Sequence, residues 1–406
     1  MTISSLNILE NGTLADVTPV NQNFETLRTG VNTNESNISG LSSDLQDLTT
    51  EVESISAIVM PDLTYEKLDS QFLVAKDKSN LTIKAGTTIR LDVSSDDVRY
   101  LEIKEDTDYN IYNIMDSGVQ SLTAGKDYYI YIVAKDVTDS GTGTITKTVE
   151  LKGSINSTYP TGYTASNSRK IGGFHTLCQA VTSSNAPALI DNNLWQSHPA
   201  IGYNAGDIIP NSVWCLSHRP IAEPAGMVYV DMIDKWVDIY LQSGTGLNTA
   251  SAFGATVTDS RTHFDHQWDM EQVKKQLASD NDFTMFAEGS NQNTAIYGSA
   301  APNPKTSGGH TDTSGKRMIS GFFVEECCGF LTQWLNEIGV AGETNWANQS
   351  ASSNRGQSYG NNRCLRAGGN WGNGSYCGSR CRAAHSARSD VSADIGGRGV
   401  SLPLRV

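Results

Sequence analysis

Charged residues are scarce in this sequence and long apolar runs are absent, and each deficit excludes a class of protein. Asp, Glu, Lys and Arg make up 18% of the 406 residues, below the roughly 25% of an average soluble domain. No run reaches the ~20 apolar residues of a membrane-spanning helix, so we expect no membrane insertion. The N-terminal residues have neither a basic segment nor a continuous apolar core, so they are not a secretory signal.

Positive charge is also scarce, and it is spread unevenly. The net charge of −14 argues against nucleic acid as the main partner, because such binders need clustered positive potential. Lysine is absent after Lys316, yet residues 355–406 contain eight Arg against two Asp, a local charge of +6. We expect most of these Arg to pack and hydrogen-bond within a loop-rich fold through their planar guanidinium groups. Affinity for anionic surfaces is the alternative.

The cysteines show no paired framework of the kind found in small secreted domains. They are seven, an odd number, at irregular spacings: Cys178, Cys215, Cys327, Cys328, Cys364, Cys377 and Cys381. We therefore expect reduced and mostly buried thiols.

A heptad repeat predicts an α-helical coiled coil over residues 23–60. More than four heptads stay in register, whereas a lone amphipathic helix drifts away from a 3.5-residue period. β-branched residues mix with Leu along the seam, which favours a parallel homotrimer, and Pro61 is expected to end the helix. The seam consists of Phe24, Leu27, Val31, Asn34, Ile38, Leu41, Leu45, Leu48, Val52, Ile55 and Val59.

Residues 61–158 have the pattern of a small β-sandwich that serves as a spacer. The apolar residues of Leu81–Val93 share one parity, as a half-buried strand requires, and Asp127–Val133 has the β-branched and aromatic content of a central strand. Farther along, apolar spacing predicts a helix over residues 272–279 and another over Cys328–Ile338, ending at Gly339.

Five segments between residues 160 and 399 resemble one family. The first, Pro160–Cys178, resembles the join between fibre body and terminal domain in bacteriophage tail proteins. The others resemble the framework of C-type-lectin-like proteins that retroelements diversify, and Gly321–Leu335 among them resembles the helix before the variable region. These are Gly321–Leu335 (GFFVEECCGFLTQWL), Asn362–Trp371 (NRCLRAGGNW), Gly378–Arg382 (GSRCR) and Ile395–Gly399 (IGGRG).

The resemblance implies a multidomain phage tail-fibre receptor-binding protein. Residues 1–22 would attach to other phage tail proteins, and residues 159–406 would form an α+β C-type lectin fold, shared with formylglycine-generating enzymes, with a variable region at about 345–399. The partner would be a protein or glycan of the bacterial surface. The protein would be made in the host cytoplasm, released by lysis and carried on the virion. No cofactor, metal or catalytic residue is implied.

The residue types near the C-terminus agree with this diversification mechanism. Miscopying of adenines in Asn codons cannot produce Lys, Glu, Gln, Met or Trp, and none of the five occurs from Gly372 to Val406. The resemblance marks fourteen exchangeable positions as a paratope of small, polar and aromatic side chains on a rigid scaffold. They are Tyr359, Asn361, Ala367, Gly372, Asn373, Tyr376, Ala383, His385, Ser386, Ala387, Ser389, Asp390, Ser392 and Asp394. Trp371, Arg363, Arg380 and Arg382 are expected to support the fold.

Three other functions fit parts of the sequence. A structural fibre or baseplate component needs only the heptads. A formylglycine-type oxidase would use Cys377 and Cys381, although their spacing differs from the expected C-x4-C, and a depolymerase would need paired carboxylates, which are few after Glu343. His263 and His266 lie at i, i+3 but have no suitably spaced third metal ligand, and His175 is expected to be structural.

The diversification hypothesis predicts a second, near-identical copy of the codons for about residues 345–399 beside a reverse-transcriptase gene. The two copies should differ mainly at adenines of the template, because only these bases are miscopied. Sequencing the flanking DNA tests this, and finding no such repeat would favour the structural and enzymatic alternatives.

Overall fold

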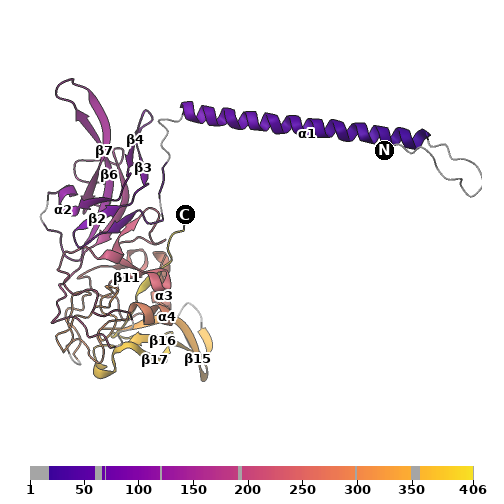
Figure 1. The fold of residues 1–406 in the computed structure, drawn as a ribbon. Coiled ribbons are helices and arrows are strands. Elements are labelled where there is room, and N and C mark those ends of the chain that lie inside the picture. The colour runs from indigo at the N-terminus through magenta and orange to yellow at the C-terminus, as the bar shows by residue number, and fades with distance from the viewer. Residues whose placement is uncertain are drawn as a thin grey trace, which may run out of the picture. The chain divides into compact units, whose positions relative to one another are not determined.

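The computed structural model describes residues 18–59, 66–68, 70–118, 121–190, 194–297, 300–348 and 357–405. Contacts divide the chain into two compact units, residues 1–65 and 66–406. The order of elements, a long helix followed by β-rich and α+β parts, confirms the coarse outline of the predicted fold (Figure 1). No helix in the described ranges has the length and apolar content to cross a membrane.

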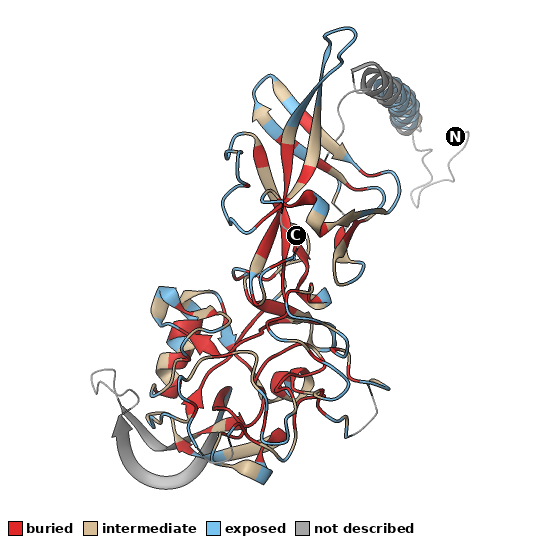
Figure 2. Cartoon of the chain, turned by 90° about the vertical axis from the view of Figure 1, so that its left-hand side faces the viewer, coloured by how far each residue is buried: buried red, intermediate tan, exposed pale blue. Residues whose placement is uncertain are grey.

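The first unit contains the helix α1 (Thr18–Val59), whose 42 residues span about 63 Å. The predicted helix is therefore confirmed, although the predicted end at Pro61 lies outside the described residues. The apolar seam from Phe24 to Leu48 is exposed, with fractions between 42% at Phe24 and 68% at Leu41 (Figure 2). Exposure of a row of apolar side chains to water is unfavourable, so packing this face of α1 against another apolar surface would stabilise it.

The second unit begins with three sheets around one hydrophobic core. The first sheet consists of β1 (Leu73–Ala75), β2 (Asn80–Ile83) and β5 (Thr107–Asn110), and the second of β3 (Thr88–Ser94) and β4 (Asp97–Glu102). The third, in the order β7-β6-β8-β9, contains β6 (Asp127–Thr138), β7 (Ile145–Ser154), β8 (Ser168–His175) and β9 (Trp214–Cys215). A short helix, α2 (Ile111–Ile114), precedes β6.

The predicted central strand is confirmed, because β6 lies between β7 and β8 and its residues 128–133 are buried (Figure 2). β8 pairs with β6, so this sheet crosses the boundary predicted at residues 158 and 159. Leu81–Val93 was expected to be one strand but forms β2 and β3 in different sheets, with Gly86 at φ 79° between them. The shared parity persists because both strands face the same core.

The remainder of this unit is an α+β domain with long loops. One sheet has the order β10-β11-β19-β14, and another has the order β17-β16-β15-β18. The first contains β10 (Met227–Val230), β11 (Lys235–Asp238), β14 (Gln276–Leu277) and β19 (Gly399–Ser401). The second contains β15 (Thr332–Asn348), β16 (Gln357–Gly368), β17 (Gly378–Ala387) and β18 (Ile395–Gly396). The domain also contains two helices, α3 (His263–Gln272) and α4 (Asp280–Phe286), and a hairpin of β12 (Gln242–Ser243) and β13 (Ala250–Ser251). Its 3₁₀ turns are η1 (Pro210–Ser212), η2 (Asp231–Ile233), η3 (Gly246–Asn248) and η4 (Gly374–Tyr376).

The predicted helix over residues 272–279 is wrong. α3 ends at Gln272, and Lys274 adopts a left-handed conformation at φ 59°, which a continuing α-helix cannot contain. The observed helices begin instead at capping boxes, in which Thr262 bonds with Asp265 and Ser279 bonds with Asp282.

The predicted helix over Cys328–Ile338 is also wrong, because β15 begins at Thr332. Residues 323–335 are all buried, so this segment carries no amphipathic period that separates helix from strand. The 3–4 spacing of its apolar residues does not mark one helical face, because successive residues at the start of β15 are all buried, while β16 and β18 pair with its two edges. The helix implied for Gly321–Leu335 is corrected for the same reason.

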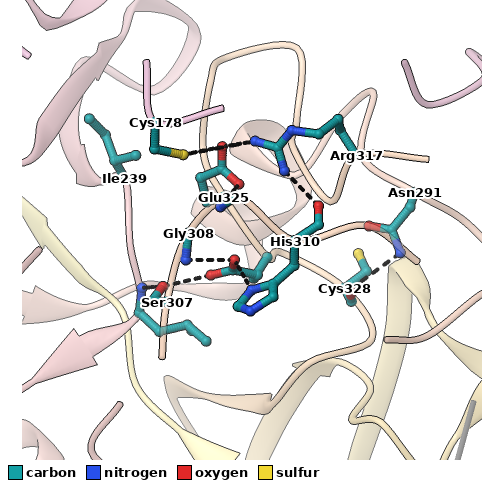
Figure 3. A network of polar contacts seen from close by, with 12 residues as sticks. Cys178, Ile239, Asn291, Ser307, Gly308, His310, Arg317, Glu325 and Cys328 are labelled. Atoms are coloured by element: carbon teal, nitrogen blue, oxygen red, sulfur yellow. Dashed lines mark hydrogen bonds and ion pairs between the residues drawn. The ribbon is translucent and has the colours of Figure 1, made fainter. Parts of the chain in front are cut away.

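A network of buried charges lies inside the α+β domain (Figure 3). Arg317 donates to Glu325 Oε1 at 2.6 Å and to the carbonyl of His310 at 2.5 Å. The Cys178 thiol lies 3.3 Å from the same carboxylate oxygen of Glu325. The side chains of Arg317 and Glu325 are 0% and 1% exposed, so their charges neutralise each other away from water.

The neighbouring Glu326 binds three donors. His310 Nδ1 lies 2.7 Å from its carboxylate, Ser307 Oγ 2.6 Å and the backbone nitrogen of Gly308 2.7 Å. Burial by itself would lower the pKa of His310, but the hydrogen bond and the charge of Glu326 outweigh it and raise that pKa. Burial by itself would raise the pKa of Glu326, but its hydrogen bonds, that of His310 first, lower it. Folding thus favours a charged pair.

The predicted reduced thiols are confirmed: all seven cysteines are free, six of them are buried, and only Cys381 is half-buried.

The raised pKa of His310 predicts that its contribution to stability depends on pH. Protonated His310 stabilises the fold fully below its unfolded pKa of about 6.5, and this contribution is lost as pH rises through the folded pKa. We expect His310→Gln to reduce the free energy of unfolding most below about pH 6.5 and progressively less at higher pH. Urea unfolding between pH 5 and 9 measures the difference from wild type.

His263→Gln is the matched control, with the opposite sign. Burial lowers the pKa of His263 to about 4, so its contribution is present above about pH 6.5 and is lost as pH falls toward 4. Parallel curves for the two variants would contradict a charged His310–Glu326 pair.

Candidate functional site

A pocket of about 520 Å³ opens between β17 and the segments around residues 370 and 390–395. Figure 1 shows β15–β17 at the end of the second unit opposite to β6 and β7. Seven of the fourteen positions predicted from the sequence line this pocket, although they come from three separate stretches of chain. They are Asn373, Ala383, His385, Ser386, Asp390, Ser392 and Asp394. Folding therefore brings half of the predicted set to one concave surface.

Backbone pairing and one carboxylate hold the pocket walls together. β17 supplies Ala383 and His385, and it pairs with the central strand β16. On the opposite wall, the side chain of Asp394 accepts hydrogen bonds from Asn370 Nδ2 and Ser392 Oγ, and its carbonyl accepts from the Thr332 amide at 3.0 Å. Asp394 thus joins the Asn370 loop to the start of β15.

The remaining predicted positions do not line the pocket. Tyr359 and Asn361 lie on β16 where the side chains are outside the described residues, and Ala367 is fully buried, which removes it from any binding surface. β16 is covered on that side by the domain core, a fact that the residue type Ala does not reveal. Gly372, Tyr376, Ala387 and Ser389 are exposed or half-buried outside the pocket lining, and Tyr376 is 80% exposed.

Two of the arginines expected to support the fold do so. Arg382 donates to Asp280 and to Thr284 Oγ1, the latter at 2.7 Å, and its guanidinium lies 5.0 Å from the centre of the Phe283 ring. Arg363 donates to the carbonyl of His385, which positions β17. Arg380 differs from the expectation, because its side chain is exposed.

Trp371, also expected to support the fold, packs beside the core cluster that contains Phe330, and Lys305 Nζ lies 5.6 Å from the centre of its ring. It therefore holds the Asn370 loop against the domain.

The sequence did not single out Arg366, which lines the pocket from β16. It is 7% exposed, its Nη2 lies 2.9 Å from His385 Nε2, and its guanidinium lies 5.5 Å from the centre of the Trp334 ring. Burial lowers the pKa of Arg366, opposed by the charges of Asp394 and Asp390. The signal available in the sequence was the local excess of Arg, but it could not distinguish this Arg from those in the framework.

The cysteine pair considered for catalysis has poorly reactive thiols. Burial raises the pKa of Cys377 to about 12, and it also raises the pKa of Cys381, with Arg382 and Arg366 opposing. A thiolate is the reactive form, so at neutral pH both groups are held as thiols. Cys377 donates instead to the carbonyl of Asn370 at 3.3 Å, a structural contact.

The histidines considered as metal ligands bind protein groups. His263 Nε2 lies 2.8 Å from the Leu335 carbonyl, and His266 Nδ1 lies 2.6 Å from Gln242 Oε1. Burial lowers their pKa values to about 4 and about 3. Within the described ranges, no group of three His, Cys, Asp or Glu is arranged to hold a metal ion. His175, expected to be structural, is buried between Asp127 at 2.8 Å and the Tyr240 hydroxyl at 3.0 Å.

Comparisons with known proteins agree with this architecture. Residues 71–215 match the family model described as the Mtd second domain, and that match ends at the last residue of β9. The chain is 29% identical over 303 residues to the "Tail fiber receptor-binding protein" of Bordetella phage BPP-1, which covers 69% of this chain and 72% of that relative.

Solved structures extend the match over most of the chain. The Major Tropism Determinant I1 variant superposes with a TM-score of 0.65 at 26% identity, covering 84% of this chain and 86% of that one. The M1 variant gives 0.65 at 25% identity, covering 84% and 85%. The family predicted from the sequence is thereby confirmed: the chain belongs to the Major Tropism Determinant family of phage tail-fibre receptor-binding proteins.

Proposed function

We propose that this chain binds a bacterial surface receptor through the pocket lined by β17, Arg366 and residues 390–395. The observation that carries the proposal is the convergence of seven predicted positions from separate stretches on one open pocket. A curated relative is named for receptor binding in a phage tail fibre, which is the function that such a surface would perform here. The surface lies on an end of the unit, where a large partner has access (Figure 1).

We also propose that the exposed positions around this pocket are exchangeable. Apart from the carboxylate of Asp394, the walls are held by backbone pairing of β16 with β17 and by the parallel pairing of β15 with β18. These backbone bonds do not depend on the side chains that face the pocket. Ala383 and His385 belong to this set, and a change at either leaves those backbone bonds in place. Buried Ala367 is excluded from the set, since a larger side chain there would disturb the core.

The stem is proposed to assemble three chains in parallel. The exposed apolar seam of α1 supplies the contact surface, and its 3.5-residue period places that surface along one continuous stripe. Three copies would present three pockets, and simultaneous binding can raise the apparent affinity by about 10²–10⁴ when the geometry permits it. Weak individual pockets would then suffice for adsorption to a cell.

A binding role is proposed over an enzymatic one. The two candidate thiols are held protonated, and the carboxylates of Asp390 and Asp394 are bonded to neighbouring groups of the protein. We place the protein on the virion, with residues 1–22 attached to other tail proteins, and expect neither nucleic acid nor a membrane as partner. A purely structural fibre protein is the competing function, and the first experiment below separates the two.

Filling the pocket should abolish binding without unfolding the domain. In Ala383→Trp the indole occupies space that a receptor group would need, so we expect at least about tenfold weaker adsorption to a bacterial strain that the wild-type chain binds. Flow cytometry of labelled protein on cells measures adsorption, and thermal unfolding checks the fold.

Val137→Trp is the matched control, since Val137 is 45% exposed and belongs to β6, which lies at the end of the second unit opposite to β15–β17 (Figure 1). Equal adsorption by wild type and both variants would show that the pocket does not bind the receptor.

Disrupting the stem should lower adsorption by removing avidity. We expect Leu41→Asp combined with Leu45→Asp to convert a trimer into monomers, because charges placed in the seam cannot be buried without a partner. Sedimentation measures the mass, and adsorption should fall about 10²-fold or more. Ser43→Asp, on the opposite side of the heptad, should change neither quantity, and a wild-type monomer would contradict the proposed assembly.

A further inference from the structure

Arg366 places a positive charge in the pocket wall, and the described part of the chain supplies no counter-ion for it. Its contacts within the described part of the chain are the hydrogen bond of Nη2 to His385 Nε2 and the packing of the guanidinium on Trp334. Nε is buried without a partner, and no carboxylate forms an ion pair with this guanidinium among the described residues. Because Arg366 is 93% buried, water cannot solvate the charge as it does at the surface.

Such a charge is unfavourable unless an acceptor neutralises it. The other buried arginines of this domain show the usual arrangement: Arg317 is paired with Glu325, and Arg398 is surrounded by carbonyl oxygens. His385 accepts the Arg366 bond through Nε2, so it contributes no negative charge. The lowered pKa of Arg366 agrees with incomplete compensation. Arg366 is therefore a desolvated donor that still lacks an anionic acceptor.

The two carboxylates of the pocket have partners of their own. Asp390 accepts from the Ala387 amide at 2.8 Å, and Asp394 accepts from Asn370 and Ser392. They keep further acceptor capacity, because a carboxylate has about four lone-pair sites. The Arg366 side of the pocket therefore favours an anionic ligand group. The side that carries Asp390 and Asp394 can accept hydrogen bonds and repels a second negative charge.

We propose that the pocket takes a sugar acid, with its single carboxylate on Arg366 and its hydroxyls on Asp390 and Asp394. The proposal rests on the receptor-binding function proposed above and names its ligand class. A guanidinium binds a planar carboxylate through two parallel hydrogen bonds, and sugar hydroxyls can donate to the acceptor sites that remain on the two Asp side chains. The pocket volume of about 520 Å³ lies within the range of small-ligand sites.

The same groups disfavour other anions. A phosphate or an acidic peptide brings several negative charges close to Asp390 and Asp394, and Glu or Asp side chains offer no hydroxyl donors to them. The lining contains short polar residues such as Asn373, Ser386 and Ser392 rather than an apolar surface for a peptide anchor. Arg366 was not among the positions predicted to vary, so the acid group would be recognised constantly while the exchangeable positions select the rest of the sugar.

Titration of the full chain with matched sugar pairs tests the proposal. The probes are the methyl glycosides of galacturonate, glucuronate, mannuronate and N-acetylneuraminate, each with its uncharged parent or reduced sugar, at 150 mM salt. We expect at least one acid to bind at least about tenfold more tightly than its uncharged counterpart. Arg366→Met should remove that preference, measured by calorimetry or by ligand-observed NMR.

Arg380→Met is the matched control, because it removes the same charge from an exposed Arg outside the pocket lining. Should Arg366→Met fail to fold, Ala383→Trp fills the pocket without changing its charge, and it should abolish binding of the same acid. Loss of binding by either pocket variant, with Arg380→Met unchanged, supports the proposal.

Three results would overturn the proposal. They are no binding of any of the four acids, equal weakening by Arg380→Met, or equal binding of poly-glutamate. If the wild-type chain still adsorbs to cells and Ala383→Trp still prevents it, receptor binding at the pocket stands and only the ligand class is wrong. If Ala383→Trp leaves adsorption unchanged, the proposed function itself fails.

Discussion

The buried guanidinium of Arg398 is the contact on which the terminal domain depends. It is 1% exposed, and it donates to Gln333 Oε1 at 2.9 Å and to the carbonyls of Asp238 and Ile239 at 2.8 Å each, as well as to the carbonyl of Glu325. These acceptors belong to the start of β15, to the end of β11 with the residue that follows it, and to the segment that carries the buried carboxylate Glu325. One rigid, planar group thus joins the two sheets of the domain, and without it several carbonyls would be buried with no donor.

The strands that form the pocket are connected to the hydrogen bonds of Arg398. β15 pairs with β18 and β16, and β16 carries β17, so the strands below the candidate receptor surface are all connected to the segment that Arg398 holds. Side chains facing the pocket can then differ without loss of the fold, as in other binding loops on rigid scaffolds. Arg366 is an exception, because it lies on the scaffold strand β16 and yet lines the pocket with a charged group.

The site was predicted in part, and each error has a physical cause. The seven positions that line the pocket lie on β17 and in loops near the surface, where a family motif and the residue types were sufficient. Ala367 was misplaced because a small residue is compatible with both a surface and a core, and β16 is buried at that point. The helix predicted over Cys328–Ile338 failed because continuous burial hides the period on which such predictions rest. The helix predicted over residues 272–279 failed because Lys274 adopts a left-handed conformation at φ 59°, and no Gly or Pro in that segment indicated this in the sequence.

The sequence by itself determined the long helix, the central strand β6, the reduced cysteines and the family. These follow from local periodicity, residue type and motifs, which act over a few neighbouring residues. Only the tertiary structure decided that β8 and β9 complete the sheet of β6, and that Arg366 lies against His385 and Trp334 with no counter-ion among the described residues. Those facts depend on contacts between residues far apart in the chain. The burial of a charge is a property of its surroundings, and a list of residue types does not contain it.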